Sequence, residues 1–199
     1  AVESHGLLSD LRRRVEELSL LNEMGRTIAG SRDVDRVLRE GAEAARRLVD
    51  ASHAIVLLHE PLRAELRLAG GVGFALDALA PLAMPLADAT AVCRAVRERR
   101  PVVVDDAAAE GAVDARWLRA LAPRSLVAAP VLLRGEPLGV LAVDECRRAR
   151  RFTPSEVERL TAVANQLAVA IENARLYTET RRRAQELGLL HEVGRSLVE

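Results

Sequence analysis

The sequence predicts an α+β domain in which helices pack on a central antiparallel β-sheet. Short apolar runs with β-branched residues alternate with segments of helical periodicity. Two of these runs, in residues 125–145, flank Arg134-Gly135-Glu136, a pattern typical of a β-hairpin because Gly135 can take a positive φ. The last segment, which starts at Pro154, contains no further Pro and no Gly before Gly188, so we expect one long helix there.

The first expected helix covers residues 7–29 and has two apolar faces. One face has the 3-4-3 spacing of a coiled-coil seam and consists of Leu8, Leu11, Val15 and Leu18. The other consists of Leu21, Met24 and Ile28. Two faces on one helix indicate two packing partners, one inside the domain and one outside it.

The next elements alternate between helix and strand. Ser31 or Asp33 can cap a helix that ends near residue 49. The run "HAIVLLHE" (53–60) is short and β-branched, as expected for a buried strand. A second strand is predicted in "AELRLAGGVG" (64–73), and we expect a short helix over the sheet within 73–89.

A helix over 89–99, stopped by Pro101, precedes a third strand in "VVVDD" (102–106) and a short helix at 114–121. After the hairpin, Thr153 is the expected N-cap of the last helix, and Glu156 completes a capping box. Along this helix one seam consists of Val157, Leu160, Ala164, Leu167, Ile171 and Ala174, and Val163, Ala170 and Tyr177 lie on another side. The second side again predicts a partner outside the domain.

Composition excludes several classes of protein. Lys plus Arg and Asp plus Glu number 29 each, so the chain lacks the basic excess typical of nucleic-acid binders. No apolar run approaches the roughly 18 residues of a membrane span, and we expect no membrane insertion. Two cysteines, Cys93 and Cys146, are too few for a disulfide scaffold, which favours reduced thiols and a cytoplasmic location.

The chain resembles a GAF domain, the small-molecule sensing module of many signalling proteins. The resemblance spans about residues 22–178 and rests on the order and spacing of four segments: "DVDRVLREGAEAARRLVDASHAIVLLHE", "RRPVVVDD", "RSLVAAPVLLRGEPLGVLAVDE" and "FTPSEVERLTAVANQLAVAIENARLY". It implies a GAF-like fold, a central antiparallel sheet with helices packed on it, and long N- and C-terminal signalling helices.

The two ends of the chain are similar in sequence. Residues 12–30 read "RRRVEELSLLNEMGRTIAG", and residues 181–199 read "RRRAQELGLLHEVGRSLVE". This indicates the first of a tandem pair of GAF domains. The expected division is an N-terminal dimerisation helix (1–29), a GAF core (30–153), a connecting helix (154–185) and the start of a second GAF repeat (186–199). The alternative is that both ends are generic coiled coil.

The resemblance also implies a ligand pocket between the sheet and segments 69–99 and 105–122. The candidate pocket residues are Phe74, Leu82, Met84, Cys93, Val96, Trp117, Leu121, Ser125 and Val127. The alternative is that these residues only fill the core. The cofactor, if there is one, stays unknown, and so does the identity of the ligand.

Several specific ligands and activities fit poorly. Segment 105–122 has no Cys for a bilin thioether, and the cyclic-nucleotide pattern of the family is incomplete in the corresponding residues Asp144-Glu145, Phe152 and Glu156-Val157. His53 and His59 are expected on one face of a strand, but nothing completes a metal or haem site. Cys93 and Cys146 do not reproduce the cysteine cluster of GAF-like sulfoxide reductases, so we expect no enzyme.

The leading functional hypothesis is therefore a sensory module of a signal-transduction protein, such as a two-component system. It binds an unidentified small molecule or relays a signal through paired helices to an output domain: a histidine kinase, a cyclase or a transcription regulator. The alternatives are a ligand-free dimerisation and relay module and a thiol-dependent redox enzyme. We expect a homodimer whose interface includes Leu8, Leu11, Val15, Leu18, Leu160, Leu167, Ile171 and Ala174.

Overall fold

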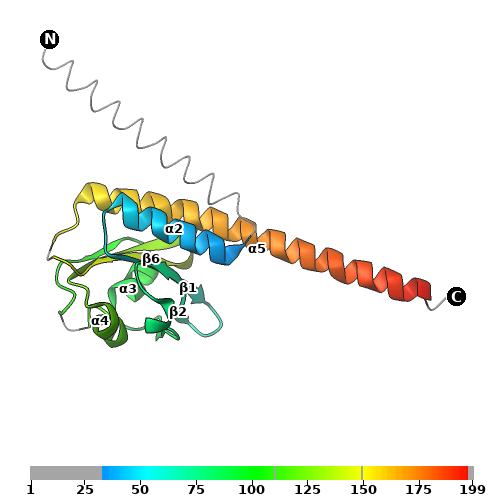
Figure 1. The fold of residues 1–199 in the computed structure, drawn as a ribbon, viewed down its shortest axis with the longest axis horizontal. Helices are drawn as coiled ribbons and strands as arrows, with labels where there is room; N and C mark the ends of the chain where they lie inside the picture. The colour runs from blue at the N-terminus through cyan, green and yellow to red at the C-terminus, as the bar shows by residue number, and fades with distance from the viewer. Residues whose placement is uncertain (1–32, 110, 149, 197–199) are drawn as a thin grey trace, which may run out of the picture.

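The computed structural model describes residues 33–109, 111–148 and 150–196. The helix expected over 7–29 lies outside these residues. A six-stranded antiparallel sheet forms the middle layer, with two helices on one face and shorter elements on the other (Figure 1). This is the expected α+β architecture.

The sheet has the strand order β3-β2-β1-β6-β5-β4, so that the strands next to one another are antiparallel throughout. Its strands are β1 (His53–Glu60), β2 (Glu65–Val72), β3 (Ala83–Pro85), β4 (Val102–Val104), β5 (Ser125–Leu133) and β6 (Glu136–Glu145). The central strands β1, β6 and β5 are mostly apolar because both of their faces are covered.

Helices α2 (Val34–Leu48) and α5 (Pro154–Ser196) cover one face of the sheet and pack against each other. Asp33 caps α2, and its carboxylate accepts from the Asp35 N–H at 3.1 Å. The two helices approach closely at Gly41, where a Cβ would lie 2.8 Å from a methyl group of Leu167. Side chains of both helices join the sheet in one apolar core that includes Val37, Ala45, Val127, Val143, Leu160 and Ile171.

The opposite face of the sheet is covered by α3 (Ala91–Glu98), by α4 (Ala115–Leu121) and by segment 73–90. Here the core includes Ile55, Leu82, Met84, Val96, Trp117 and Val140. Two separate cores therefore lie on the two sides of one sheet, and each strand residue belongs to one or the other by the alternation of the strand.

The expected hairpin is confirmed. Strands β5 and β6 pair from Ser125↔Glu145 to Leu133↔Glu136. Arg134 and Gly135 both have positive φ, 52° and 85°, as a two-residue turn of type I′ requires. The segment 73–89 differs from expectation. It contains only a 3₁₀ turn, η1 (Leu76–Ala78), and the edge strand β3, which pairs with β2 at Glu65↔Pro85.

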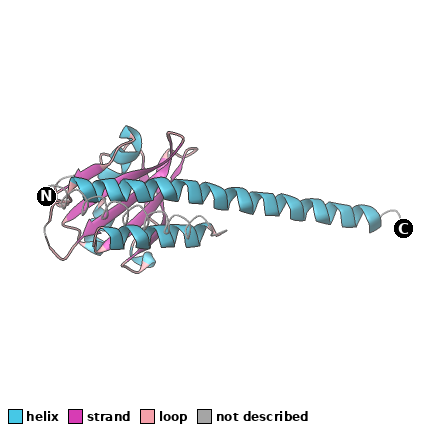
Figure 2. Ribbon diagram, turned by 90° about the horizontal axis from the view of Figure 1, so that it is seen from above, coloured by secondary structure: helices cyan, strands magenta, loops and turns pink. Residues whose placement is uncertain are grey.

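The expected capping box at the start of α5 is also present. The Thr153 N–H donates to Glu156 at 2.7 Å, and the Glu156 N–H donates to the Thr153 hydroxyl at 3.3 Å. The first part of α5 lies on the sheet, and the rest projects away from the domain (Figure 2). Residues 175–185 are all exposed. No helix in the described part of the chain is both long and apolar enough to span a membrane.

Candidate functional site

Most of the candidate pocket residues lie together in the core under α3 and α4. Leu82, Met84, Cys93, Val96, Trp117 and Leu121 all belong to this core, and Phe74 packs at its edge. None of the six core members exposes more than 8% of its surface. In this structure their side chains pack against one another and against the sheet.

Two of the candidates lie on the other face of the sheet. Val127 belongs to the core beneath α2 and α5, which corrects its assignment to the pocket. Ser125 is two residues away on β5 and therefore points to the same side as Val127. Ser125 is fully buried, and its hydroxyl has no hydrogen-bond partner among the described residues. The error arose because a run buried on both faces shows no alternation in its sequence.

The α4 face contains one buried polar cluster. The Trp117 indole N–H donates to one carboxylate oxygen of Asp144 at 2.9 Å, and Nδ1 of His53 lies 2.7 Å from the other. Asp144 and Trp117 are 0% and 1% exposed. Phe74 packs edge-on against the His53 ring, with centroids 5.9 Å apart. The only Trp of the chain is thus bonded to a carboxylate at the base of this core.

Hydrogen bonds hold the elements that cover this face. Arg116 of α4 donates to the carbonyls of Pro81 and Ala83, at 3.3 and 2.8 Å. Arg97 of α3 donates to the carbonyls of Leu86 and Asp88. The Cys93 thiol donates to the Pro85 carbonyl at 3.4 Å, and burial raises the pKa of this thiol. Arginine side chains therefore tie both helices to segment 81–88.

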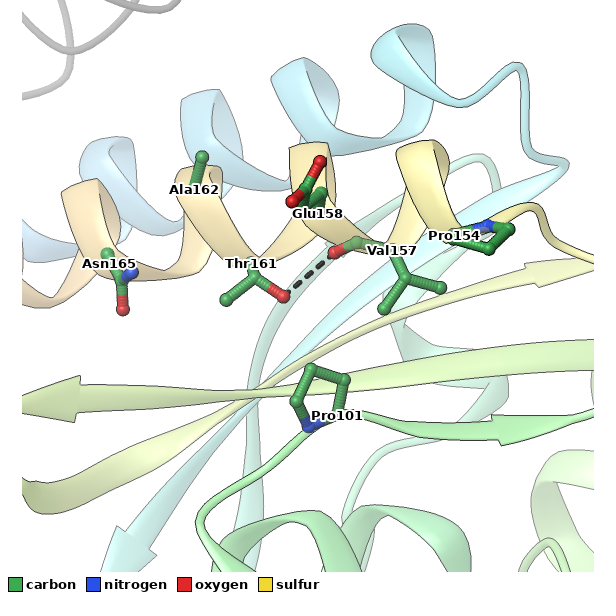
Figure 3. Close-up of a pocket in the computed structure, with 7 residues that line it drawn as sticks. All are labelled: Pro101, Pro154, Val157, Glu158, Thr161, Ala162 and Asn165. Atoms are coloured by element: carbon green, nitrogen blue, oxygen red, sulfur yellow. Dashed lines mark hydrogen bonds between the residues drawn. The ribbon is translucent and has the colours of Figure 1, made fainter.

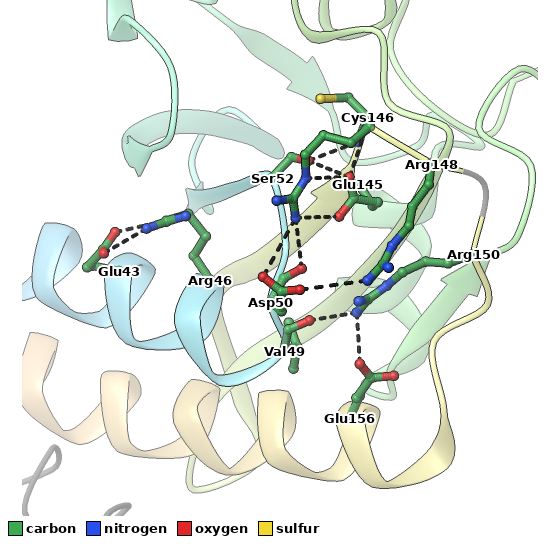
Figure 4. A network of polar contacts seen from close by, with 11 residues as sticks. Glu43, Arg46, Val49, Asp50, Ser52, Glu145, Cys146, Arg148, Arg150 and Glu156 are labelled. Carbon is green, nitrogen blue, oxygen red and sulfur yellow. Dashed lines mark hydrogen bonds and ion pairs between the residues drawn. The ribbon is translucent and has the colours of Figure 1, made fainter.

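A second buried carboxylate, Glu145, lies at the end of β6 on the face of α2 and α5. It accepts from the Ser52 hydroxyl at 2.7 Å, from the Arg147 backbone N–H at 2.7 Å and from the Arg147 guanidinium. The Ser52 hydroxyl also accepts from the Cys146 N–H at 3.1 Å (Figure 4). Burial alone would raise the pKa of Glu145, but these hydrogen bonds lower it to about 2.

The same region holds the start of α5. Arg147 donates to the Asp50 carbonyl at 3.2 Å, just after α2 ends. Arg150 donates to the Val49 carbonyl at 2.6 Å and to Glu156 of α5 at 2.8 Å (Figure 4). We call these seven residues the strand-end junction: Val49, Asp50, Ser52, Glu145, Arg147, Arg150 and Glu156. It connects the end of α2, the start of β1, the end of β6 and the start of α5.

An open groove of about 530 Å³ lies between α5 and the segment that enters the edge strand β4 (Figure 3). It is lined by Pro101, Pro154, Val157, Glu158, Thr161, Ala162 and Asn165. Val103 of the neighbouring edge strand is 44% exposed. The groove is thus a partly apolar surface of α5, on the other side of the sheet from Trp117.

The structure corrects four of the expected dimer contacts. Leu160, Leu167, Ile171 and Ala174 are at most 1% exposed and belong to the protomer's own core. Their seam is the one that packs on α2 and the sheet, so it is not available to a second subunit. Leu8, Leu11, Val15 and Leu18 lie outside the described residues, and the contacts expected of them stay a prediction.

Neither buried carboxylate was among the residues expected to function. The available signal was the pair Asp144-Glu145 at the end of an otherwise apolar strand, since ionisable residues are rarely fully buried unless they are paired. Arg147 lies two residues from Glu145, but the other partners of this pair, Trp117, His53 and Ser52, lie 27 to 93 positions away, and no local pattern in the sequence identifies them.

Comparisons with known proteins show which family has this architecture. The model of the GAF domain family matches residues 31–172. The circadian input-output histidine kinase CikA of Thermosynechococcus vestitus is 38% identical over 56 residues, which are 28% of this chain and 8% of the kinase. The match therefore spans only a small part of that relative.

Two solved structures have the same fold. Residues 122 to 287 of a methyl-accepting chemotaxis protein superpose with a TM-score of 0.66 at 26% identity, covering 77% of this chain and 97% of that one. A free methionine-R-sulfoxide reductase from Neisseria meningitidis, in complex with its substrate, gives a TM-score of 0.67 at 21% identity, covering 80% and 90%. With most of its length matched by the family model, the chain belongs to the GAF domain family.

Proposed function

We propose that this chain is the sensory part of a cytoplasmic signal-transduction protein. A small molecule binds on the sheet face covered by α3 and α4, and α5 carries the response to an output domain. The similarity to a histidine kinase and to a chemotaxis protein supports a role in signalling. The presence of an output domain is itself proposed, because this chain matches only a small part of its kinase relative.

The observation that carries the proposal is the continuity of α5. Its first turns share a core with the sheet, and the same uninterrupted helix extends to Ser196, away from the domain. A helix transmits a shift or rotation of one end along its length because its backbone hydrogen bonds are continuous. A change at the sheet can therefore reach whatever follows this helix.

The α4 face is the better ligand site of the two. It is covered by short elements, α3 and α4, that are held by a few arginine-to-carbonyl hydrogen bonds. Displacing them exposes an apolar surface with one polar cluster at its base, which is the usual composition of a small-molecule pocket. The other face is closed by α2 and by the long helix itself.

We further propose a homodimer formed through the outer face of α5. Glu158, Asn165, Val169 and Leu176 are exposed on one side of this helix, opposite the residues that pack on the sheet, and the partly buried Ala162 lies beside them. Val169 and Leu176 are 49% and 52% exposed, and the groove of Figure 3 continues the same surface. A two-fold axis would pair these stripes with each other, as coiled-coil seams pair.

The proposal is tested by native mass spectrometry of the purified chain and by Trp117 fluorescence during titration with a library of metabolites. Because the indole N–H bonds to Asp144, a ligand that moves α4 changes the environment of the single Trp. We expect a bound small molecule or a saturable fluorescence change. A chain that carries no ligand and gives a flat response across the library would favour the alternative, a ligand-free relay module.

Redox catalysis is the less favoured function, although one similar structure is a reductase. Burial raises the pKa of the Cys93 thiol, and the thiolate is the reactive form. Cys146, which directly follows β6, is partly buried and is free as well. We therefore expect no thiol-dependent reduction of free methionine sulfoxide by this chain.

A further inference from the structure

One end of β6 carries a buried carboxylate on each face of the sheet. Asp144 accepts from Trp117 of α4 on one face, and Glu145, the next residue, accepts from Ser52 and Arg147 on the other. Both side chains are 0% exposed. The backbone of the same two residues is bonded too: Ser52 N–H donates to the Asp144 carbonyl, and Arg124 N–H donates to the Glu145 carbonyl.

The partners of this pair of carboxylates lie on both faces of the sheet. Trp117 belongs to α4, whereas His53 and Ser52 are neighbours at the start of β1. A buried carboxylate that loses a hydrogen-bond donor has an unsatisfied charge, which is costly. A movement of the surrounding groups that restores a hydrogen bond to it therefore lowers the free energy. Because Asp144 and Glu145 share a peptide bond, such a movement on one face displaces the acceptor on the other.

The strand-end junction continues this connection to α5. Arg147 bonds to both Glu145 and the carbonyl of Asp50, and the neighbouring Val49 carbonyl accepts from Arg150. Arg150 then bonds to Glu156, which also closes the capping box of α5. A displacement of Glu145 therefore changes the support of the first turn of the long helix.

We propose that Asp144 and Glu145 form a relay through the sheet, in which the hydrogen bond from Trp117 to Asp144 controls how firmly the strand-end junction holds the start of α5. With Trp117 bonded, the junction is intact; with α4 displaced, Asp144 loses a donor, Glu145 shifts, and the first turns of α5 open more often. This relay depends on the proposed sensing function in one respect only, namely that a ligand is what displaces α4. The coupling itself is a property of this chain alone.

Hydrogen exchange of the full chain without ligand tests the relay. Trp117→Phe removes the N–H donor and keeps an aromatic ring, and we expect amides in residues 158–164 to exchange about five- to tenfold faster than in the wild type. Leu121→Ala is the matched control, because it removes apolar contact from α4 but leaves the indole N–H in place. We expect it to change exchange in residues 158–164 by less than about twofold.

A double-mutant cycle measures the same coupling in the folding equilibrium. Trp117→Phe and Ser52→Ala remove one donor on each face of the sheet, and their side chains do not bond to each other. If the relay exists, the effect of the double variant on the folding equilibrium constant deviates from the product of the single effects by at least about threefold. If Trp117→Phe does not fold, Asp144→Asn replaces it in both experiments.

Additive effects in the cycle, together with unchanged exchange in residues 158–164, would overturn the relay. The sensing function would survive that result, because it is tested separately by ligand titration. Conversely, a chain that binds no ligand but has coupled donors would retain the relay and lose the proposed sensing role.

Discussion

Gly139 of β6 lies so close to Leu57 of β1 that a Cβ at residue 139 would stand 2.2 Å from the Leu57 carbonyl oxygen. The obstructing atom belongs to the backbone of a central strand, so it cannot rotate away as a side chain could. Strands β1 and β6 are the middle of the sheet, and their pairing positions Asp144 beside His53. Only a residue without a side chain at position 139 therefore allows the strand pairing that brings Asp144 beside His53 in the candidate site.

We expect Gly139→Ala to destabilise the domain by about 3 kcal/mol, because the two central strands must separate locally. Urea unfolding followed by circular dichroism measures this loss. Gly135→Asn is the matched control: residue 135 has φ 85°, which Asn tolerates, and no atom beyond its own chain neighbours lies within 4 Å of the added Cβ. The control should cost less than about 1 kcal/mol. Equal losses in the two variants would contradict the close approach.

Glu145 should make stability depend on pH in the acid range. Its pKa is lowered from 4.5 to about 2 in the folded state, so its stabilisation is complete above pH 4.5 and is lost as the pH falls towards 2. A difference of this size corresponds to about 3 kcal/mol. The measurement is the free energy of unfolding by urea between pH 7 and pH 2.5.

The Glu145→Gln variant isolates this contribution. The hydrogen bond from Arg46 also lowers the pKa of Glu43 to about 2, so the wild-type curve alone contains more than one carboxylate. In Glu145→Gln the acid-dependent loss should shrink by about 3 kcal/mol, while the loss due to Glu43 remains. Parallel curves for the two proteins would mean that Glu145 is not held by the strand-end junction in solution.

The capping box gives a prediction that needs one substitution. Thr153→Ala removes the hydroxyl that accepts from the Glu156 N–H and should cost about 1 kcal/mol of stability. Thr180→Ala is the matched control on the same helix, because its hydroxyl bonds back to the Leu176 carbonyl within the helix and caps nothing. Thermal unfolding should show a lower Tm for Thr153→Ala and an almost unchanged Tm for the control.

The elements with local sequence signals were predictable. The type I′ turn at Arg134 and Gly135 and the cap at Thr153 depend on residues close together in the chain, and both are present. Strand β3 was missed because its three residues, Ala83–Pro85, are too few to form a pattern, and its pairing with β2 joins residues 16 to 20 positions apart.

The faces of the buried elements were not predictable from spacing. In α5 two apolar sides compete, and only the approach of α2 at Gly41 decides that Leu167 points inward. For the candidate site, the sequence identified Trp117 and most of its apolar neighbours. It did not identify Asp144, because the hydrogen bond between Trp117 and Asp144 joins a helix to a strand through the tertiary fold.

The outer face of α5 gives the test of the proposed homodimer. Val169→Glu with Leu176→Glu places two charges on this face, and both side chains are about half exposed, so the protomer should keep its stability. In a symmetric dimer each charge meets its own copy, and like charges at a closely packed seam weaken association strongly. Analytical ultracentrifugation should therefore show a dimer for the wild type and a monomer for the double variant.

The control for this test changes the charge equally on the opposite side of the same helix. Thr178→Glu with Gln185→Glu also adds two negative charges seven residues apart, at exposed positions half a turn away from Leu176. If the outer stripe is the interface, this variant remains a dimer, and a Leu11→Glu, Val15→Glu variant shows whether the N-terminal seam contributes. If the dimer forms through one side of α5, only charges on that side should dissociate it. Dissociation in both α5 variants would therefore indicate a general effect of charge and would rule out this stripe as the contact.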